Sequence, residues 1–375
     1  MSENRLLKNR SFIVVPFTYK EQTDFDVFMR GNFVSFHKSE VEKEPLLNHI
    51  SELYEKVNYY VKEPDYKEME ENSVALVKSA VYLFPTMLGF YVSELEFGES
   101  VAVEDMITAL KDLVEYIEAR DKVFETKWKT EAAFKQIGED VIQAMSLFSE
   151  KQNVCFLFHS VAEKISEEQA YNLRHINKLG TLPPNDVSKK NETVEAQLQI
   201  DKVHDYHLSA KCMAMVLGLS KETIRESKES YIPKYQENYV NNSFLLFLLL
   251  HHERQIMVRC KNDMIEVLNS RKKGIQMLKS NILDCLSFYS FQTVSDDSIT
   301  QLVYDRYKEV LKIPQMEETM SNLIFKLDDE LEKKKEKKMN QLTFGIAVFG
   351  IVSIIGATMD IIAHLLNWFG PTQLP

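Results

Sequence analysis

The sequence FGIAVFGIVSIIGATMDIIAHLLNWF, residues Phe344–Phe369, decides how this chain is organised. Its strongly polar side chains are those of Asp360, His364 and Asn367. As a helix, this segment would be about 39 Å long, which is enough to cross the hydrocarbon core of a bilayer with some tilt. We therefore expect one transmembrane helix over residues 344–369, followed by a short outer tail over residues 370–375.

A cluster of five lysines stands immediately before this segment: Lys333, Lys334, Lys335, Lys337 and Lys338. The residues after it, Gly370–Pro375, carry no charged side chain. Lysine-rich flanks of membrane helices stay in the cytoplasm, where they meet anionic lipid headgroups. This asymmetry predicts a single-pass protein of the cell membrane, with its large N-terminal part in the cytoplasm and the lysines at the membrane surface.

A stalk helix is expected over residues 314–343, between the soluble part and the membrane. Pro314 suits the first turn of a helix, and neither Gly nor Pro follows it before the membrane segment. A coiled-coil-like stripe of apolar residues runs along it: Met316, Met320, Leu323, Leu327 and Leu331. Three acidic residues, Asp328, Asp329 and Glu330, could bind a divalent cation between subunits, although a solvated helix face is the simpler interpretation.

Residues 234–313 predict long helices. Apolar residues recur at three- and four-residue steps after Met257, which is typical of an amphipathic helix. The run FLLFLLL, Phe244–Leu250, is too short to cross a bilayer and is expected to be a buried helix end. The residues that follow it, His251, His252 and Glu253, are expected to close this end as a polar network.

Residues 1–182 predict an α+β cytosolic domain within a mainly α-helical chain. The short apolar runs Ser11–Phe17 and Asn153–Ser160 are typical of strands. Apolar residues at helical intervals predict four helices: Leu46–Val61, Ser73–Leu95, Val103–Ala119 and Trp128–Ser149. Residues 183–233 are expected to be a linker with short helices, among them Tyr206–Leu217, because the polar, proline-containing stretch 180–190 indicates a break between domains.

Composition restricts the classes of function. The chain has 375 residues and a net charge of −11, which argues against nucleic acid as a partner. Nucleotide-binding, hydrolase and metalloprotease signatures such as GxGxxG, GxSxG and HExxH do not occur in it. The segment Asp201–His207 has the residue types of a metal site, but its neighbours His204 and Asp205 would point apart, so a solvated interdomain segment is preferred.

The polar and small residues of the membrane segment share one helix face: Ser353, Gly356, Asp360, His364 and Asn367. A carboxylate that faces lipid costs about 2.5–3.5 kcal/mol at the bilayer centre, so this face is expected to turn toward identical helices in a homo-oligomer. Gly356 would permit close approach of the helices. Three alternatives stay open: a water-filled path, assembly without conduction, or a crossing that ends near Met359 with an interfacial helix after it.

The order of these elements resembles the CorA-type divalent-cation channel superfamily. The similar stretches are NSFLLFLLLHHERQIMVR, Asn242–Arg259, and MNQLTFGIAVFGIVSIIGA, Met339–Ala357. CorA proteins carry a Gly-Met-Asn signature and a second crossing, whereas this chain reads Ala-Thr-Met-Asp at 357–360 and has one apolar segment. No selectivity-filter residue therefore carries over from that family.

Divergent CorA-like proteins occur as membrane effectors of antiviral systems, in which a cytosolic domain senses a nucleotide signal and the membrane part opens. The resemblance implies that role here, with a small nucleotide-type ligand or a partner protein as the trigger. No catalytic residue or cofactor is expected. The alternatives are a tail-anchored scaffold, whose helix is only a tether, and a membrane-anchored enzyme with an unfamiliar active site.

Overall fold

The computed structural model describes residues 6–19, 25–33, 35–39, 53–64, 74–98, 101–119, 140, 155–162, 169, 172, 196–199, 204–209, 212–218, 232–270, 280, 283 and 291–368. The chain divides into two compact units. Unit 1 consists of Met1–Arg259 and Cys285–Glu317, and unit 2 consists of Cys260–Asp284 and Glu318–Pro375. Two helices contribute residues to both units, namely α7 (Ile232–Ser270) and α10 (Ile313–Trp368).

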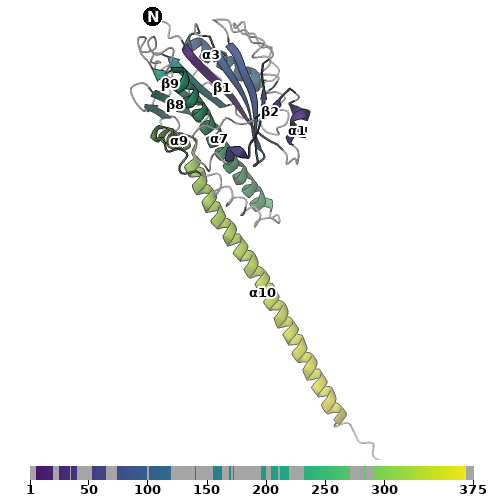
Figure 1. Ribbon diagram of the computed structural model, residues 1–375. Coiled ribbons are helices and arrows are strands. Elements are labelled where there is room, and N and C mark those ends of the chain that lie inside the picture. Colours follow the sequence, from purple (N-terminus) through teal and green to yellow (C-terminus); the bar gives the residue numbers. More distant parts are fainter. Residues whose placement is uncertain are drawn as a thin grey trace, which may run out of the picture. The chain divides into compact units, whose positions relative to one another are not determined.

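A nine-stranded sheet with the order β2-β3-β4-β5-β1-β6-β9-β8-β7 forms the centre of unit 1 (Figure 1). Neighbouring strands are antiparallel except β6 and β9, which are parallel. The strands are β1 (Leu6–Thr18), β2 (His37–Ser39), β3 (Asn58–Lys62), β4 (Val74–Phe84), β5 (Leu88–Phe97), β6 (Cys155–Ala162), β7 (Ala196–Gln199), β8 (His204–Ser209) and β9 (Cys212–Gly218).

The central strand β1 confirms the predicted strand Ser11–Phe17. Its run of apolar residues is continuous because both faces of the sheet are covered. Ile13 and Val15 point into one core, and Phe12 and Val14 point into the other. Pro16 is compatible with this position because, among the described residues, the pairing of β1 with β6 ends at Val14, so the nitrogen of Pro16 is not needed in that part of the ladder.

Helices cover the two faces of the sheet with separate cores. On the first face, α1 (Phe25–Asn32) and α3 (Val103–Ala119) pack through Met29, Met106 and Leu110. On the second face, α7, α9 (Ser298–Val310) and the first residue of α10 pack against the other side of the same strands. The prediction of helix for Val103–Ala119 is confirmed.

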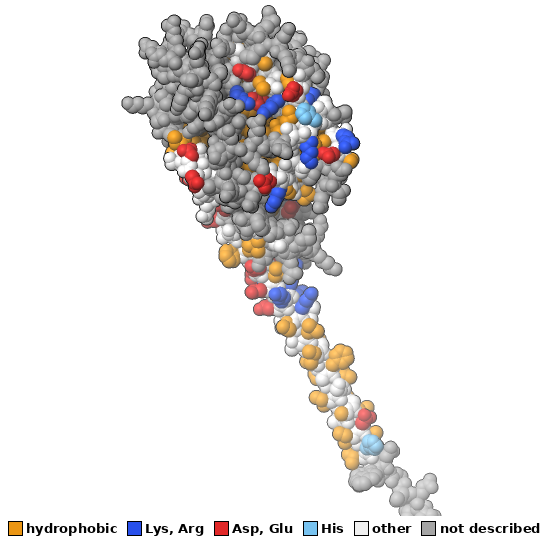
Figure 2. Space-filling view, in the orientation of Figure 1, with side chains coloured by type: hydrophobic (Ala, Val, Ile, Leu, Met, Phe, Trp, Pro, Cys, Tyr) orange, Lys and Arg blue, Asp and Glu red, His pale blue; other side chains and the backbone are white. Residues whose placement is uncertain are grey.

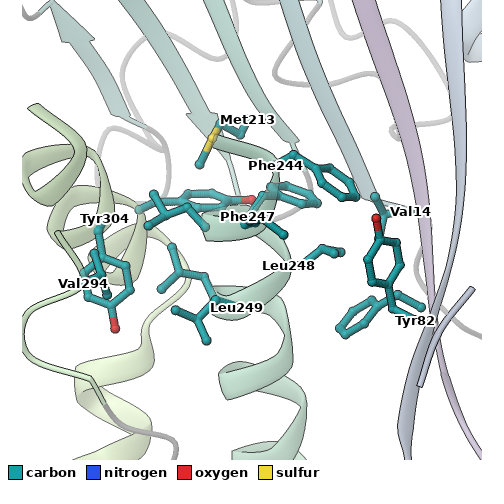
Figure 3. Close-up of a cluster of buried hydrophobic side chains, with 14 of the residues drawn as sticks. Val14, Tyr82, Met213, Phe244, Phe247, Leu248, Leu249, Val294 and Tyr304 are labelled. Carbon is teal, nitrogen blue, oxygen red and sulfur yellow. The ribbon is translucent and has the colours of Figure 1, made fainter. Parts of the chain in front are cut away.

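The run Phe244–Leu250 lies in the second core, and all seven residues are buried. Figure 3 shows Phe244, Phe247 and Leu249 of α7 among side chains of the sheet and of α9. The ring of Phe244 stacks on that of Phe12 at 4.8 Å between centroids. The run is thus buried as predicted, but it lies in the interior of α7 and not at a helix end.

Three predicted helices contain strands instead. Ser73–Leu95 forms the hairpin of β4 and β5, and Tyr206–Leu217 forms the hairpin of β8 and β9. Leu46–Val61 ends in β3 after a short helical turn at residues 53–55. The predicted linker of short helices, 183–233, therefore contains three strands of the same sheet. Strands buried on both faces carry continuous apolar runs, which fit a helical period as well as a strand period.

The predicted strand Asn153–Ser160 is confirmed as β6. The predicted boundary between the long helical region, which ends at residue 313, and the stalk helix, which begins at Pro314, corresponds to the boundary between α9 and α10. Asp297 caps α9, and its Oδ2 accepts from the backbone nitrogen of Thr300 at 2.8 Å. Lys312, with φ at 60°, separates α9 from α10, and Pro314 lies in the first turn of α10. Most of the predicted helix Trp128–Ser149 and the stretch 180–190 lie outside the described residues.

Replacing Gly89 with alanine is expected to destabilise unit 1 by about 1–3 kcal/mol, the usual effect of overpacking a core. Gly89 pairs with Phe17 across β5 and β1, and a Cβ at Gly89 would stand 2.5 Å from two ring carbons of Phe17. Urea unfolding of the full chain in detergent measures the change. Gly31→Ala is the matched control, because a Cβ there meets nothing within 4 Å. Equal stability of the two variants would contradict the tight contact between Gly89 and Phe17.

Candidate functional site

The apolar part of α10 is the first candidate site. Helix α10 has 56 residues and runs from Ile313 to Trp368 without interruption, which at about 1.5 Å per residue is about 84 Å. Within the described residues, it is the one helix that is long and apolar enough to cross a membrane. The large apolar side chains from Phe344 to Leu365 are exposed in the single chain. One long apolar helix at this end of the chain is consistent with a single-pass membrane anchor.

The structure places the predicted stripe on this helix. Ser353, Gly356, Asp360 and His364 are exposed along one face of α10, whereas the side chain of Asn367 lies outside the described residues. A Cβ at Gly356 would meet nothing within 4 Å, so this point of the helix surface is open to a neighbour. The described part of the chain therefore leaves this stripe exposed.

The cluster of five lysines, Lys333, Lys334, Lys335, Lys337 and Lys338, lies on α10 immediately before the apolar segment and is called the lysine collar below. Figure 2 shows the band of lysine and acidic side chains there, followed by apolar side chains. Lys333 pairs with Asp329 at 2.6 Å and with Glu330 at 3.8 Å along the same helix. The hydrogen bond from Lys333 to Asp329 raises the pKa of that lysine. Lys334, Lys335, Lys337 and Lys338 are exposed around the helix.

The acidic residues Asp328, Asp329 and Glu330 do not converge on one point. Consecutive residues of a helix are separated by about 100°, so their carboxylates point in three directions. Asp329 is also engaged by Lys333. In the described part of the chain, no group of His, Cys, Asp and Glu side chains is arranged to hold a metal ion.

Two residues of the predicted stalk stripe are covered within one chain. Met320 and Leu327 are seven residues apart on α10 and are buried, with 1% and 0% of their surface exposed. Phe325, by contrast, is 72% exposed. Met320 and Leu327 are thus buried within a single chain.

A buried polar network in unit 1 is the second candidate site. It is centred on His251, His252 and Glu253 of α7, which follow the apolar run Phe244–Leu250 and are themselves fully buried. Nε2 of His251 lies 3.0 Å from the hydroxyl of Tyr307 on α9. Nε2 of His252 lies 2.9 Å from Oγ1 of Thr86, in the turn between β4 and β5. The predicted polar network is confirmed, but it does not close a helix end, because α7 continues to Ser270. Its partners come from separate elements.

Glu253 connects the network to the start of α10. Lys308 of α9 lies between two carboxylates, with its Nζ 3.1 Å from Oε1 of Glu253 and 3.1 Å from Oε1 of Glu317. The hydroxyl of Tyr304 lies 2.9 Å from the carbonyl oxygen of Phe291 and 3.3 Å from Oε2 of Glu253, and its single proton is shared between these two acceptors. One lysine thus joins α7, α9 and the N-terminal end of α10.

Burial dominates the electrostatics of this network. It lowers the pKa of His251 and that of His252 to about 3, with a further contribution from Arg254 at His251. Burial raises the pKa of Glu253 to about 7, although the ion pair with Lys308 acts in the opposite direction. Burial, with the Glu253 charge nearby, also raises the pKa of Tyr304. Both histidines are therefore neutral at pH 7.

Sequence reasoning did not identify the partners of this network. Tyr304 and Tyr307 belong to the buried face of α9, together with Val303 and Val310. Their spacing of three and four residues was the available signal. The role of Thr86 could not be predicted, because a helix was expected over Ser73–Leu95 and the turn that contains Thr86 was therefore not expected. Thr86 also accepts at its carbonyl oxygen from Arg259 at 3.1 Å.

A second buried cluster lies on the opposite face of the sheet. The hydroxyl of Tyr91 on β5 accepts from Ser93 at 2.8 Å and lies 3.1 Å from that of Ser79. It donates to Oδ2 of Asp140 at 3.4 Å, and Oδ1 of Asp140 pairs with Lys62 at 3.1 Å. Its groups are joined to one another, which is typical of a structural polar cluster.

The segment Asp201–His207 is not a solvated interdomain stretch as predicted. Its second half belongs to strand β8, and His207 is 1% exposed. The side chains of His204 and Asp205 lie outside the described residues. A strand between β7 and β9 belongs to the sheet, which corrects the prediction for this part of the segment.

A comparison with protein families, curated proteins and solved structures finds no match to this chain. The functional interpretation therefore depends on α10 and on the network that surrounds its first turn.

Proposed function

We propose that this chain is a homo-oligomeric membrane protein with a cytoplasmic α+β domain. The domain senses a ligand or a partner protein and alters the packing of a bundle of membrane helices, which gates or perturbs the membrane. The lysine collar sits at the inner surface of the bilayer, in agreement with the distribution of lysine. A CorA-like channel or antiviral effector is the form of this proposal that the sequence resemblance suggests.

One observation carries the proposal. Helix α10 begins at Ile313, which is fully buried in the second core of unit 1, and the same helix contains the apolar segment. The ion pair between Lys308 and Glu317, the fifth residue of α10, holds this end of the helix. A change in the packing around this end would therefore act on the apolar segment without an intervening flexible linker.

The polar stripe supports assembly of several copies. Asp360 and His364 are one helical turn apart on a surface that the chain leaves exposed. A single apolar helix of this kind in lipid would hold a carboxylate among acyl chains, at a cost that neighbouring helices can offset. A water-filled path also needs several copies, since each chain supplies one crossing.

Replacing Asp360 with leucine is expected to weaken each helix–helix contact about three- to tenfold, the order of magnitude of one hydrogen bond between membrane helices. The particle mass in mild detergent and in lipid discs should fall, and the ion leak of vesicles that contain the chain should decrease by a similar factor. Ile362→Leu is the matched control, because Ile362 lies on the opposite side of the helix.

Two results would contradict the proposal. A monomeric wild-type chain in lipid discs would remove the bundle. Retained function after residues 344–369 are replaced with polyleucine would show that the helix is only a tether, as in a tail-anchored scaffold.

A further inference from the structure

The angular positions of residues around the axis of α10 relate the charged residues 332–338 to the polar stripe that contains Asp360. Because the helix is continuous from Ile313 to Trp368, every position can be placed on one wheel at about 100° per residue. Relative to Asp360, Lys338 lies about 40° and Lys334 about 80° to one side. Glu332 lies about 80° and Glu336 about 120° to the other side.

The stripe is thus flanked by opposite charges at the level of the collar. Lys335 lies within about 20° of the stripe direction, and Lys333 and Lys337 lie on the far side of the helix. Lys333 is engaged by Asp329. The four flanking side chains, those of Glu332, Lys334, Glu336 and Lys338, are exposed, and none of them has an ion-pair partner within the part of the chain that the structure describes.

We propose that the occupant of both flanks is a second copy of this chain, with Glu332 and Glu336 of one copy paired to Lys334 and Lys338 of the next. This inference rests on the proposed homo-oligomer and specifies how its copies meet. Copies inserted in the same direction are parallel, and a rotation about the bundle axis then places the acidic flank of each helix beside the basic flank of its neighbour. The arrangement corresponds to the charged positions that flank the apolar seam of a parallel coiled coil.

Charge complementarity favours a second copy over lipid at these positions. Anionic headgroups would attract the two lysines but repel Glu332 and Glu336, which lie at the same level of the helix. Neighbouring copies on the two sides of each helix satisfy both flanks: one neighbour pairs with the acidic flank and the other with the basic flank. The same pairing fixes the rotation of each helix so that Asp360 and Ser353 turn toward the bundle axis.

The test is charge reversal in the full chain, reconstituted in vesicles of neutral phosphatidylcholine. Glu332→Lys with Glu336→Lys makes both flanks basic and turns two attractive surface pairs into repulsive ones, which should weaken each contact about tenfold. The fourfold variant that also carries Lys334→Glu and Lys338→Glu swaps the flanks and should restore the wild-type oligomer. The fourfold variant contains two changes from Glu to Lys and two from Lys to Glu. It therefore has as many lysines beside the membrane segment as the wild type, and the orientation of the chain in the membrane should not change. Cross-linking within the vesicles and particle mass measure the oligomer, and 1 M salt should reduce the difference.

Each outcome decides a separate claim. Loss of the oligomer in the reversed variant and its return in the swapped variant supports the pairing. A wild-type oligomer that the reversal does not change overturns the pairing and leaves the proposed function standing, as does a loss that the swap does not restore. If the lysines contact only lipid headgroups, the charge reversal will leave the oligomer unchanged. A monomeric wild-type chain overturns the proposed function and the pairing with it.

Discussion

Replacing Lys308 with methionine is expected to lower the free energy of unfolding by about 3–5 kcal/mol at pH 8, the usual cost of breaking a buried ion pair from one side. Lys308 is the cation that faces Glu253, whose side chain has no exposed surface. Without it, the remaining polar contact of the Glu253 carboxylate among the described residues is the hydroxyl of Tyr304, 3.3 Å from Oε2. Urea unfolding of the full chain in detergent, followed by circular dichroism, measures the loss.

The defect should be smaller at pH 6 than at pH 8. Burial already raises the pKa of Glu253 to about 7 in the presence of Lys308. Loss of the lysine raises the pKa of Glu253 further, so at pH 6 the group is protonated and no uncompensated charge is buried. A defect of equal size at both pH values would show that the lost contacts of the lysine stem, and not the charge of Glu253, cause the change.

Two further variants separate the buried pair from an ordinary surface pair. Glu253→Gln combined with Lys308→Met removes both charges and should recover most of the loss, because a glutamine still accepts from Tyr304. Arg306→Met removes the exposed ion pair between Arg306 and Glu309 on the same helix and should cost less than about 1 kcal/mol.

The elements that were predictable from sequence have patterns that fit one type of secondary structure and not another. The apolar length of α10 exceeds that of a core helix, and Pro314 indicates where the helix begins. The run Ser11–Phe17 is short, apolar and rich in β-branched residues, which favours a strand. In α3, the apolar residues recur at three- and four-residue steps and so lie on one face of the helix, with polar residues on the other face.

The missed strands show where such reasoning fails. In the β4–β5 hairpin, both faces of the strands are buried in hydrophobic cores. The sequence therefore lacks the alternation of apolar and polar residues that normally identifies a strand. Pro85 and Gly89 were the signals of the turn and of the close packing on Phe17. In the β8–β9 hairpin, residues such as Ala214 and Met215 favour helix locally, and the pairing of β9 with β6 overrides this preference.

The candidate sites were predictable to different degrees. The stripe on α10 depends only on positions within one helix, so its spacing could be read directly from the sequence. The partners of His251, His252 and Glu253 come from α9 and from the β4–β5 turn, more than 50 residues away in either direction. Such contacts depend on the sheet order, which no local pattern encodes.

Acid is expected to unfold unit 1 from pH 6.5 downward, through His251 and His252. Burial lowers the pKa of each histidine from 6.5 to about 3, so between these values the unfolded chain binds more protons than the folded chain. The stability that the two neutral rings contribute is therefore complete above pH 6.5 and is lost as the pH falls toward 3. Each histidine adds a slope of about 1.4 kcal/mol per pH unit.

Glu253 acts in the opposite direction. Its pKa is raised from 4.5 to about 7, so its folded form binds the extra proton, and its contribution declines as the pH rises from 4.5 to 7. Between pH 4.5 and 6.5 the two histidines outweigh it, which leaves a net loss of about 1.4 kcal/mol for each unit of acidification. Stability should therefore be greatest near pH 6.5, as measured by urea unfolding of the full chain from pH 5 to pH 8.

Variants of His251 and His252 test whether these two residues cause the loss of stability between pH 6.5 and pH 5. His251→Gln and His252→Gln should each reduce the slope between pH 5 and 6.5 by about 1.4 kcal/mol per pH unit, since each removes one group that binds a proton only when unfolded. His37→Gln changes an exposed histidine of β2 and should leave the profile as in the wild type. A wild-type profile that is flat from pH 5 to 6.5 would mean that protons reach the two rings in the folded state. The network around the first turn of α10 would then be open to water, and it could not hold that turn as the proposed coupling requires.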